Sequence, residues 1–152
     1  MKRKLTTFFS LLLALLCSAI ALCSCGKTGE TKAVRLEFVT ETMIVMKVTE
    51  AEENATALSA LTKLKEEGLL SFTVQESTYG SYITEINGKA EEAGATSGYS
   101  WMLYTSDEEF SSTEFGTVEY DGKTYGQASL GASGLVVKAG EYYIWSYDAW
   151  SF

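Results

Sequence analysis

The run Tyr99-Ser-Trp-Met-Leu-Tyr-Thr105 combines aromatic and long apolar side chains, and a loop rich in Gly and small residues (94–98) comes directly before it. Aromatic residues are enriched in strands, and a short apolar run between turn signals is typical of a strand covered on both faces. We therefore predict a buried central strand at residues 99–105. The acidic triplet Asp107-Glu108-Glu109 that follows is expected to be a solvated turn.

Alternating patterns on both sides of this run predict further strands. Residues 34–38 and 44–48 place apolar side chains at every second position, which favours two antiparallel strands joined by a short turn. The dipeptides Asn87-Gly88 and Asp121-Gly122 are strong signals for tight hairpin turns. The remaining predicted strands lie in residues 70–74, 82–86, 118–125, 135–138 and 142–147.

Residues 50–68 carry the pattern of a helix. Leu58, Leu61 and Leu64 form an apolar stripe, Asn54 is suited to cap the start, and Gly68 is suited to end the helix in a left-handed conformation. One helix among many strands predicts an α+β fold, in which a single domain packs this helix on one mixed sheet.

The N-terminal segment has the features of a lipoprotein signal peptide. Three basic residues (2–4) precede an apolar core of about 15 residues, shorter than the roughly 20 that a spanning helix needs. The core ends in Leu22-Cys23-Ser24-Cys25-Gly26, where a small residue precedes Cys25. We predict a signal peptide at residues 1–24 and a lipid on Cys25. An ordinary secretory peptide and an uncleaved anchor helix are the alternatives.

The rest of the chain divides into a tether and one domain. Residues 25–32 are small and polar, which is typical of a flexible linker after the lipidated Cys25, and residues 33–152 have the length of one domain. The predicted location is therefore extracytoplasmic, with the lipid holding the protein to a bacterial cell membrane.

Charge and composition disfavour several functions. Residues 1–24 hold three of the twelve basic residues and no acidic one, so their removal takes the net charge from −8 to −11. Such an acidic surface repels nucleic acid. The chain has no His, and its three Cys lie within residues 1–25, so His-dependent and Cys-dependent catalysis are excluded in the domain. We expect neither an enzyme nor a metal site. A hydrolase that uses carboxylates alone is the remaining enzymatic alternative.

Four stretches, taken together, are similar to one known family. They are Asn54–Leu61, Ser77–Gly88, Gly98–Tyr104 and Val137–Tyr147. In order and spacing they resemble the transcobalamin-like C-terminal domain family, over residues 34–147. The resemblance implies a β-grasp-like domain whose loops cover one face of cobalamin or a related corrinoid. In the carriers a separate helical domain holds the other face, and the sequence shows no such domain. It also has no His to bind cobalt.

The resemblance suggests a function and a set of binding residues. It implies a membrane-anchored extracytoplasmic binding lipoprotein that contacts a corrinoid as an accessory to uptake, together with a transporter. A cell-surface module that binds protein or glycan is the alternative. The candidate ligand-binding residues are Tyr79, Tyr82, Tyr99, Trp101 and Tyr104. Aromatic side chains at strand ends can lie on a planar ligand, and alternating aromatics in strands can equally pack in the core.

Aromatic residues also gather at the end of the sequence. Trp145 and Tyr147 share one face of the last predicted strand and are expected to pack inside. Trp150 and Phe152 follow, and they either fold back as a plug or form an exposed patch for a partner.

Overall fold

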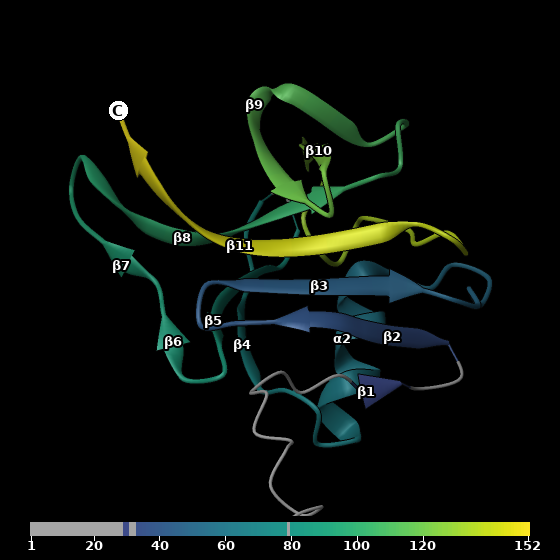
Figure 1. The fold of residues 1–152 in the computed structure, drawn as a ribbon. Coiled ribbons are helices and arrows are strands. Elements are labelled where there is room, and N and C mark those ends of the chain that lie inside the picture. The colour runs from purple at the N-terminus through teal and green to yellow at the C-terminus, as the bar shows by residue number, and fades with distance from the viewer. Residues whose placement is uncertain (1–28, 31–32, 79) are drawn as a thin grey trace, which may run out of the picture.

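The computed structural model describes residues 29–30, 33–78 and 80–152 (Figure 1). The predicted leader, Cys25 and Tyr79 lie outside these ranges. Strands make up 52% of the structure and helix 8%, so the fold is mostly β. No helix in the described ranges is long and apolar enough to cross a membrane.

Eight strands form the larger sheet (Figure 1). Its order is β1-β2-β3-β11-β8-β10-β9, and β7 also pairs with β8. The central position of the predicted strand is confirmed by β8, since β11 flanks it on one side and β10 and β7 on the other. The prediction that this strand is buried is confirmed only in part, because Trp101 and Tyr104 are buried and Tyr99 is exposed. The strands are β1 (Gly29–Glu30), β2 (Val34–Val39), β3 (Met43–Val48), β7 (Glu92–Ala93), β8 (Ser97–Thr105), β9 (Ser111–Tyr120), β10 (Lys123–Ala128) and β11 (Tyr142–Ser151).

A second layer covers one face of this sheet. It consists of a three-stranded sheet, β4 (Phe72–Gln75), β5 (Tyr82–Ile86) and β6 (Lys89–Ala90), and of helix α2 (Ala57–Glu66). The main core lies between the two layers. Its largest fully buried side chains come from β2, β3, α2, β5 and β11, and they include Leu36, Met46, Leu61, Leu64, Ile83, Ile86, Tyr143 and Trp145.

The prediction of an α+β, β-grasp-like domain with one helix on a single mixed sheet is wrong. Every strand pairing in the described residues is antiparallel, and the strands divide into two sheets, so the fold is sandwich-like. The difference arises because residues 72–90 pair with one another and not with the large sheet. Apolar alternation shows that a strand has one buried face, but it does not show which strand is its partner.

The helix is shorter than predicted and begins at a different cap. Thr56, not Asn54, is the N-cap: the Thr56 hydroxyl accepts from the Ser59 amide at 3.2 Å, and the Ser59 hydroxyl accepts from the Thr56 amide at 2.8 Å. Asn54 instead adopts a left-handed φ of 59° before the helix begins. Gly68, at φ 72°, closes the helix as predicted.

Both predicted hairpin turns are confirmed. Asn87 and Gly88 connect β5 to β6, and Asp121 and Gly122 connect β9 to β10, all with positive φ. This conformation matches the twist of two-residue hairpins. β10 extends to Ala128, three residues beyond the strand region predicted at 118–125.

Three further segments differ from expectation. Residues 135–138, predicted as a strand, contribute only an isolated bridge between Val136 and Thr56. Within the predicted tether, Gly29–Glu30 pairs with β2 as the short edge strand β1. In the acidic turn, Asp107 is buried and not solvated, because the Lys138 ammonium lies 2.8 Å from one of its carboxylate oxygens and 3.0 Å from the other. Lys138 also bonds Glu109 at 2.7 Å, and the two carboxylates raise the pKa of Lys138 above its usual value.

Candidate functional site

The five candidate residues do not share one surface. Neighbouring residues of a strand point to opposite faces, so Tyr99 and Trp101 lie on the face of β8 toward the second layer, and Tyr104 lies on the opposite face. Tyr104 is 4% exposed, in a smaller core cluster with Val45 and Ile144. Tyr79 falls outside the described residues.

Tyr104 serves the structure on its own face of the sheet. Its hydroxyl donates to Asp148 Oδ2 at 2.7 Å, and the Ser146 hydroxyl donates to Asp148 Oδ1 at 2.7 Å. Burial, followed by the bond to Asp148, raises the pKa of Tyr104 well above its ordinary value. The side chain is therefore not presented to a ligand, and it lines neither of the two hollows described next.

Tyr82 and Trp101 meet in a hollow of about 420 Å³, which we call the Tyr82 hollow. Its walls come from β5, from β8, and from the end of β10 with the loop that follows it (127–132), and they are mostly apolar, with Leu103 and Leu130 among them. Tyr82 is half-buried, and burial followed by the charge of Glu91 raises its pKa. Trp101 is 4% exposed, and its indole N–H donates to the Lys89 carbonyl at 2.9 Å.

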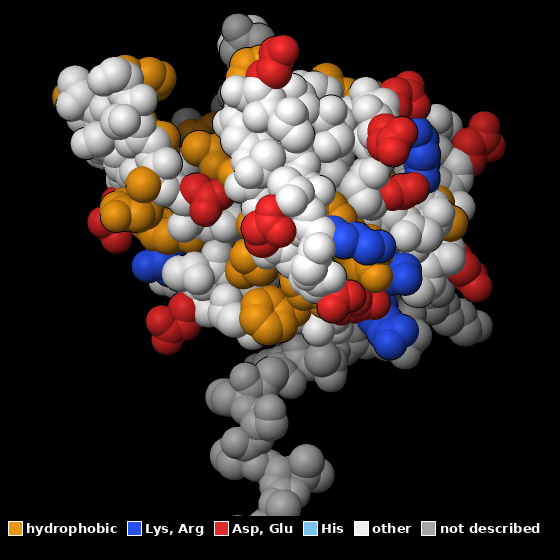
Figure 2. Space-filling view, turned by 45° about the horizontal axis from the view of Figure 1, so that its top comes forward, with side chains coloured by type: hydrophobic (Ala, Val, Ile, Leu, Met, Phe, Trp, Pro, Cys, Tyr) orange, Lys and Arg blue, Asp and Glu red, His pale blue; other side chains and the backbone are white. Residues whose placement is uncertain are grey.

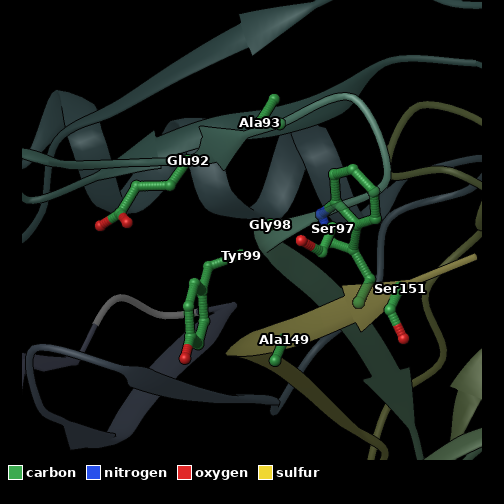
Figure 3. Close-up of a pocket in the computed structure, with 9 residues that line it drawn as sticks. Glu92, Ala93, Ser97, Gly98, Tyr99, Ala149 and Ser151 are labelled. Carbon is green, nitrogen blue, oxygen red and sulfur yellow. The ribbon is translucent and has the colours of Figure 1, made fainter.

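Tyr99 lines a second and more open hollow of about 630 Å³, which we call the Tyr99 hollow (Figure 3). It lies where the ends of β8 and β11 project beyond the small sheet, next to β7 (Figure 1). Tyr99 is 46% exposed. Glu92, Ser97 and Ser151 supply a carboxylate and two hydroxyls, and the other lining residues are Ala93, Gly94, Gly98, Ala149 and Trp150.

A stack of aromatic rings connects the two hollows. The Tyr147 ring contacts the Trp101 ring at a centroid distance of 5.3 Å. It stacks on the Tyr99 ring at 5.6 Å, and the planes of these two tyrosine rings are 10° apart. The Lys89 ammonium lies 4.2 Å from the centroid of the Tyr147 ring. The Tyr147 hydroxyl donates to the Ala90 carbonyl at 2.9 Å and lies 3.3 Å from Glu92 Oε1. Burial, followed by the charge of Glu92, raises the pKa of Tyr147.

Several residues of the Tyr99 hollow were missed by sequence reasoning. Glu92 reaches it because β7 pairs with β8, and a two-residue strand leaves no periodic pattern to detect. Trp150 reaches it because β11 continues to Ser151, four residues beyond the predicted strand. Extending the alternation from Trp145 and Tyr147 would have placed Ala149 and Ser151 on the same face of this strand, but the pairing of Ala149 with Tyr99 is set by the tertiary structure.

The hollows offer groups for reversible binding. No set of His, Cys, Asp and Glu in the described ranges is grouped to hold a metal ion. Figure 2 shows acidic side chains scattered over the visible face, with several basic ones among them. Aromatic faces, hydroxyls and a carboxylate are the groups with which a protein orients an uncharged ligand.

Comparison with protein-family models, with curated proteins and with solved structures finds no match to this chain.

Proposed function

We propose that this protein is a membrane-anchored extracytoplasmic binding lipoprotein that contacts cobalamin or a related corrinoid as an accessory to uptake. The proposal places the lipid on Cys25 and the contact in the Tyr82 hollow. One observation carries it: Tyr82 and Trp101, singled out from different family-like stretches, line the same mostly apolar hollow. A corrin ring has an apolar rim, and aromatic side chains are suited to pack against it.

The form of the hollow supports a partial contact. Leu103, Leu130 and Trp145 leave about 420 Å³, enough for part of a corrinoid edge and not for the whole molecule. A partly covered ligand gains less from burial, so affinity is expected to be modest unless a second protein covers the other side. A transporter in the same membrane would supply that second surface. Without any His, the chain has no imidazole to offer cobalt.

The test is a calorimetric titration of the full lipoprotein, purified in detergent, with cyanocobalamin and with hydroxocobalamin. Saturable binding of both, at micromolar concentration or below, is expected. The visible spectrum of hydroxocobalamin should stay unchanged, because the contact involves no imidazole on cobalt. Quenching of Trp fluorescence should follow the same curve, since Trp101 and Trp145 both line the hollow.

Two variants locate the contact. Tyr82→Ala should weaken binding, whereas Phe115→Ala, at a 70% exposed position outside both hollows, should leave binding unchanged. The proposal fails if no saturable binding of either corrinoid is found under both conditions. The conditions are the lipoprotein alone and the lipoprotein together with a corrinoid transporter from the same cells.

A further inference from the structure

We infer that the Tyr99 hollow is a separate site that binds a neutral pyranose ring of a glycan. The inference goes beyond the proposed corrinoid contact and uses other residues. It starts from the one aromatic ring of the stack that stays about half exposed, Tyr99, and from the polar groups around it.

Tyr99 is held as a rigid platform. Tyr147 covers one side of the ring by nearly parallel stacking, and Tyr147 is itself fixed by a hydrogen bond to the Ala90 carbonyl and by the Lys89 ammonium. Tyr99 also lines the hollow, and Figure 3 shows its side chain among the other lining residues. A platform that is ordered before binding loses little entropy when a ligand arrives.

The surroundings of Tyr99 suit the two sides of a sugar ring. A pyranose has C–H groups that can lie on an aromatic face and hydroxyls at its rim that need hydrogen-bonding partners. Glu92, Ser97 and Ser151 provide acceptors and donors around the same hollow. Ala149, the partner of Tyr99 on β11, has only a methyl side chain, which keeps the strand surface beside Tyr99 low.

The charge around the Tyr99 hollow disfavours other classes of ligand. The carboxylate of Glu92, in a chain with 20 acidic and 12 basic residues, repels phosphates and acidic sugars. A quaternary ammonium group is favoured by several converging aromatic faces. Of the rings Tyr99, Tyr147 and Trp101, only Tyr99 is largely open, because Tyr147 contacts both Lys89 and Tyr99 and Trp101 is buried. An uncharged sugar fits this combination.

The test uses the full lipoprotein in a detergent without a sugar headgroup. Cellohexaose, chitohexaose and mannohexaose are titrated by calorimetry, and saturation-transfer NMR shows which sugar protons touch the protein. Co-sedimentation with insoluble cell-wall polysaccharide distinguishes a wall glycan from a free oligosaccharide. We expect at least one oligosaccharide to bind, with transfer strongest to ring C–H protons.

Variants assign the binding to Tyr99. Tyr99→Ala should weaken binding by up to about tenfold, and Tyr99→Phe should retain most of it, since the stacked ring remains. Glu92→Gln should weaken binding with the ring intact, and Phe115→Ala is the matched control with no effect. Unfolding curves of each variant show whether it is folded.

The proposal is overturned if all three oligosaccharides and the wall polysaccharide fail to bind. It is equally overturned if binding survives in both folded Tyr99→Ala and folded Glu92→Gln. Cobalamin binding is measured on the same samples, so failure of the glycan site and failure of the corrinoid contact are separate results.

Discussion

The indole of Trp150 on β11 lies against Gly98, its direct partner on β8. A methyl group on Gly98 would lie 2.8 Å from Trp150 Cζ2 and would collide with the carbonyl oxygen of Glu92 on β7. Because Gly98 has no side chain, the backbone of β7 and the Trp150 ring of β11 can both lie close to β8 at this residue. The Trp150 indole N–H also donates to the Ser100 hydroxyl at 3.0 Å, which fixes the ring over the glycine.

Substitution Gly98→Ala is expected to destabilise the protein by about 1–3 kcal/mol, the usual range for overpacking. The methyl group must displace Trp150 or the β7 backbone, so the Tyr99 hollow should also change shape. Urea unfolding measures the free energy. Gly134→Ala is the matched control, because its added methyl meets no atom closer than 3.8 Å, and it should be nearly neutral. Equal stability of the two variants would contradict this packing.

Thr56→Ala is expected to lower the free energy of unfolding by about 0.5–2 kcal/mol, because the Ser59 amide loses the Thr56 hydroxyl that accepts its hydrogen bond. Asn54→Gly should change it by less than about 0.5 kcal/mol, since Asn54 is not the cap and glycine accepts its positive φ. Thermal and urea unfolding of the two variants decide which residue caps the helix. A larger loss for Asn54→Gly would reverse the assignment.

Trp101→Phe is expected to destabilise the protein by about 1–3 kcal/mol, because the Lys89 carbonyl loses its buried donor and the smaller ring leaves space. Tyr82→Phe, at a half-buried position in the same hollow, should stay within about 0.5 kcal/mol of the wild type. Comparison of these two variants shows which of the two side chains is needed for packing of the fold and which is free to contact a ligand. If Trp101→Phe were neutral in stability, the structural role of the indole N–H would be wrong.

Tyr104→Phe should lower stability near neutral pH by about 1.5–3 kcal/mol, through loss of the hydrogen bond to Asp148. The folded-state pKa of Tyr104 is raised, mainly by burial, above the value of about 10 for an unfolded chain. The native state therefore holds this proton more tightly, and the stabilisation is complete below pH of about 10 and is lost as pH rises further.

The measurement is urea unfolding of wild type and Tyr104→Phe between pH 8 and 11, a range of about three pH units around that pKa. The difference between the two proteins isolates Tyr104, because other groups contribute equally to both. It should shrink above pH of about 10. A difference that stays constant across this range would contradict the assigned cause.

Much of the local structure could be predicted from the residues alone. Alternation located β2 and β3, and the Asn87-Gly88 and Asp121-Gly122 dipeptides located two hairpin turns, because both signals depend on neighbours in the chain. The helix was predicted correctly, but its predicted range of 50–68 is longer than α2. Residues 50–56 carry acidic and small side chains that suit a helix, and the structure uses Thr56 to start it later.

The candidate site was predictable in part. The aromatic residues were identified, but their separation into two hollows and an opposite sheet face was not. The odd and even positions of Trp101 and Tyr104 already place them on different faces, and this signal was overlooked. Glu92 could not be found in this way, since it reaches Tyr99 through a pairing between β7 and β8 that is only two residues long.

The order of residues was sufficient to specify short-range features, namely which segments extend, where the chain turns, and that the folded part lacks imidazole and thiol groups. Tertiary packing settled how those segments combine. It placed β11 between β3 and β8, set residues 72–90 apart as a second sheet, and brought Lys89, Tyr147 and Tyr99 into one stack. The physical reason is that a strand's backbone hydrogen bonds accept any partner of suitable register. The choice among partners depends on which arrangement buries the most apolar surface, and that quantity belongs to the whole molecule.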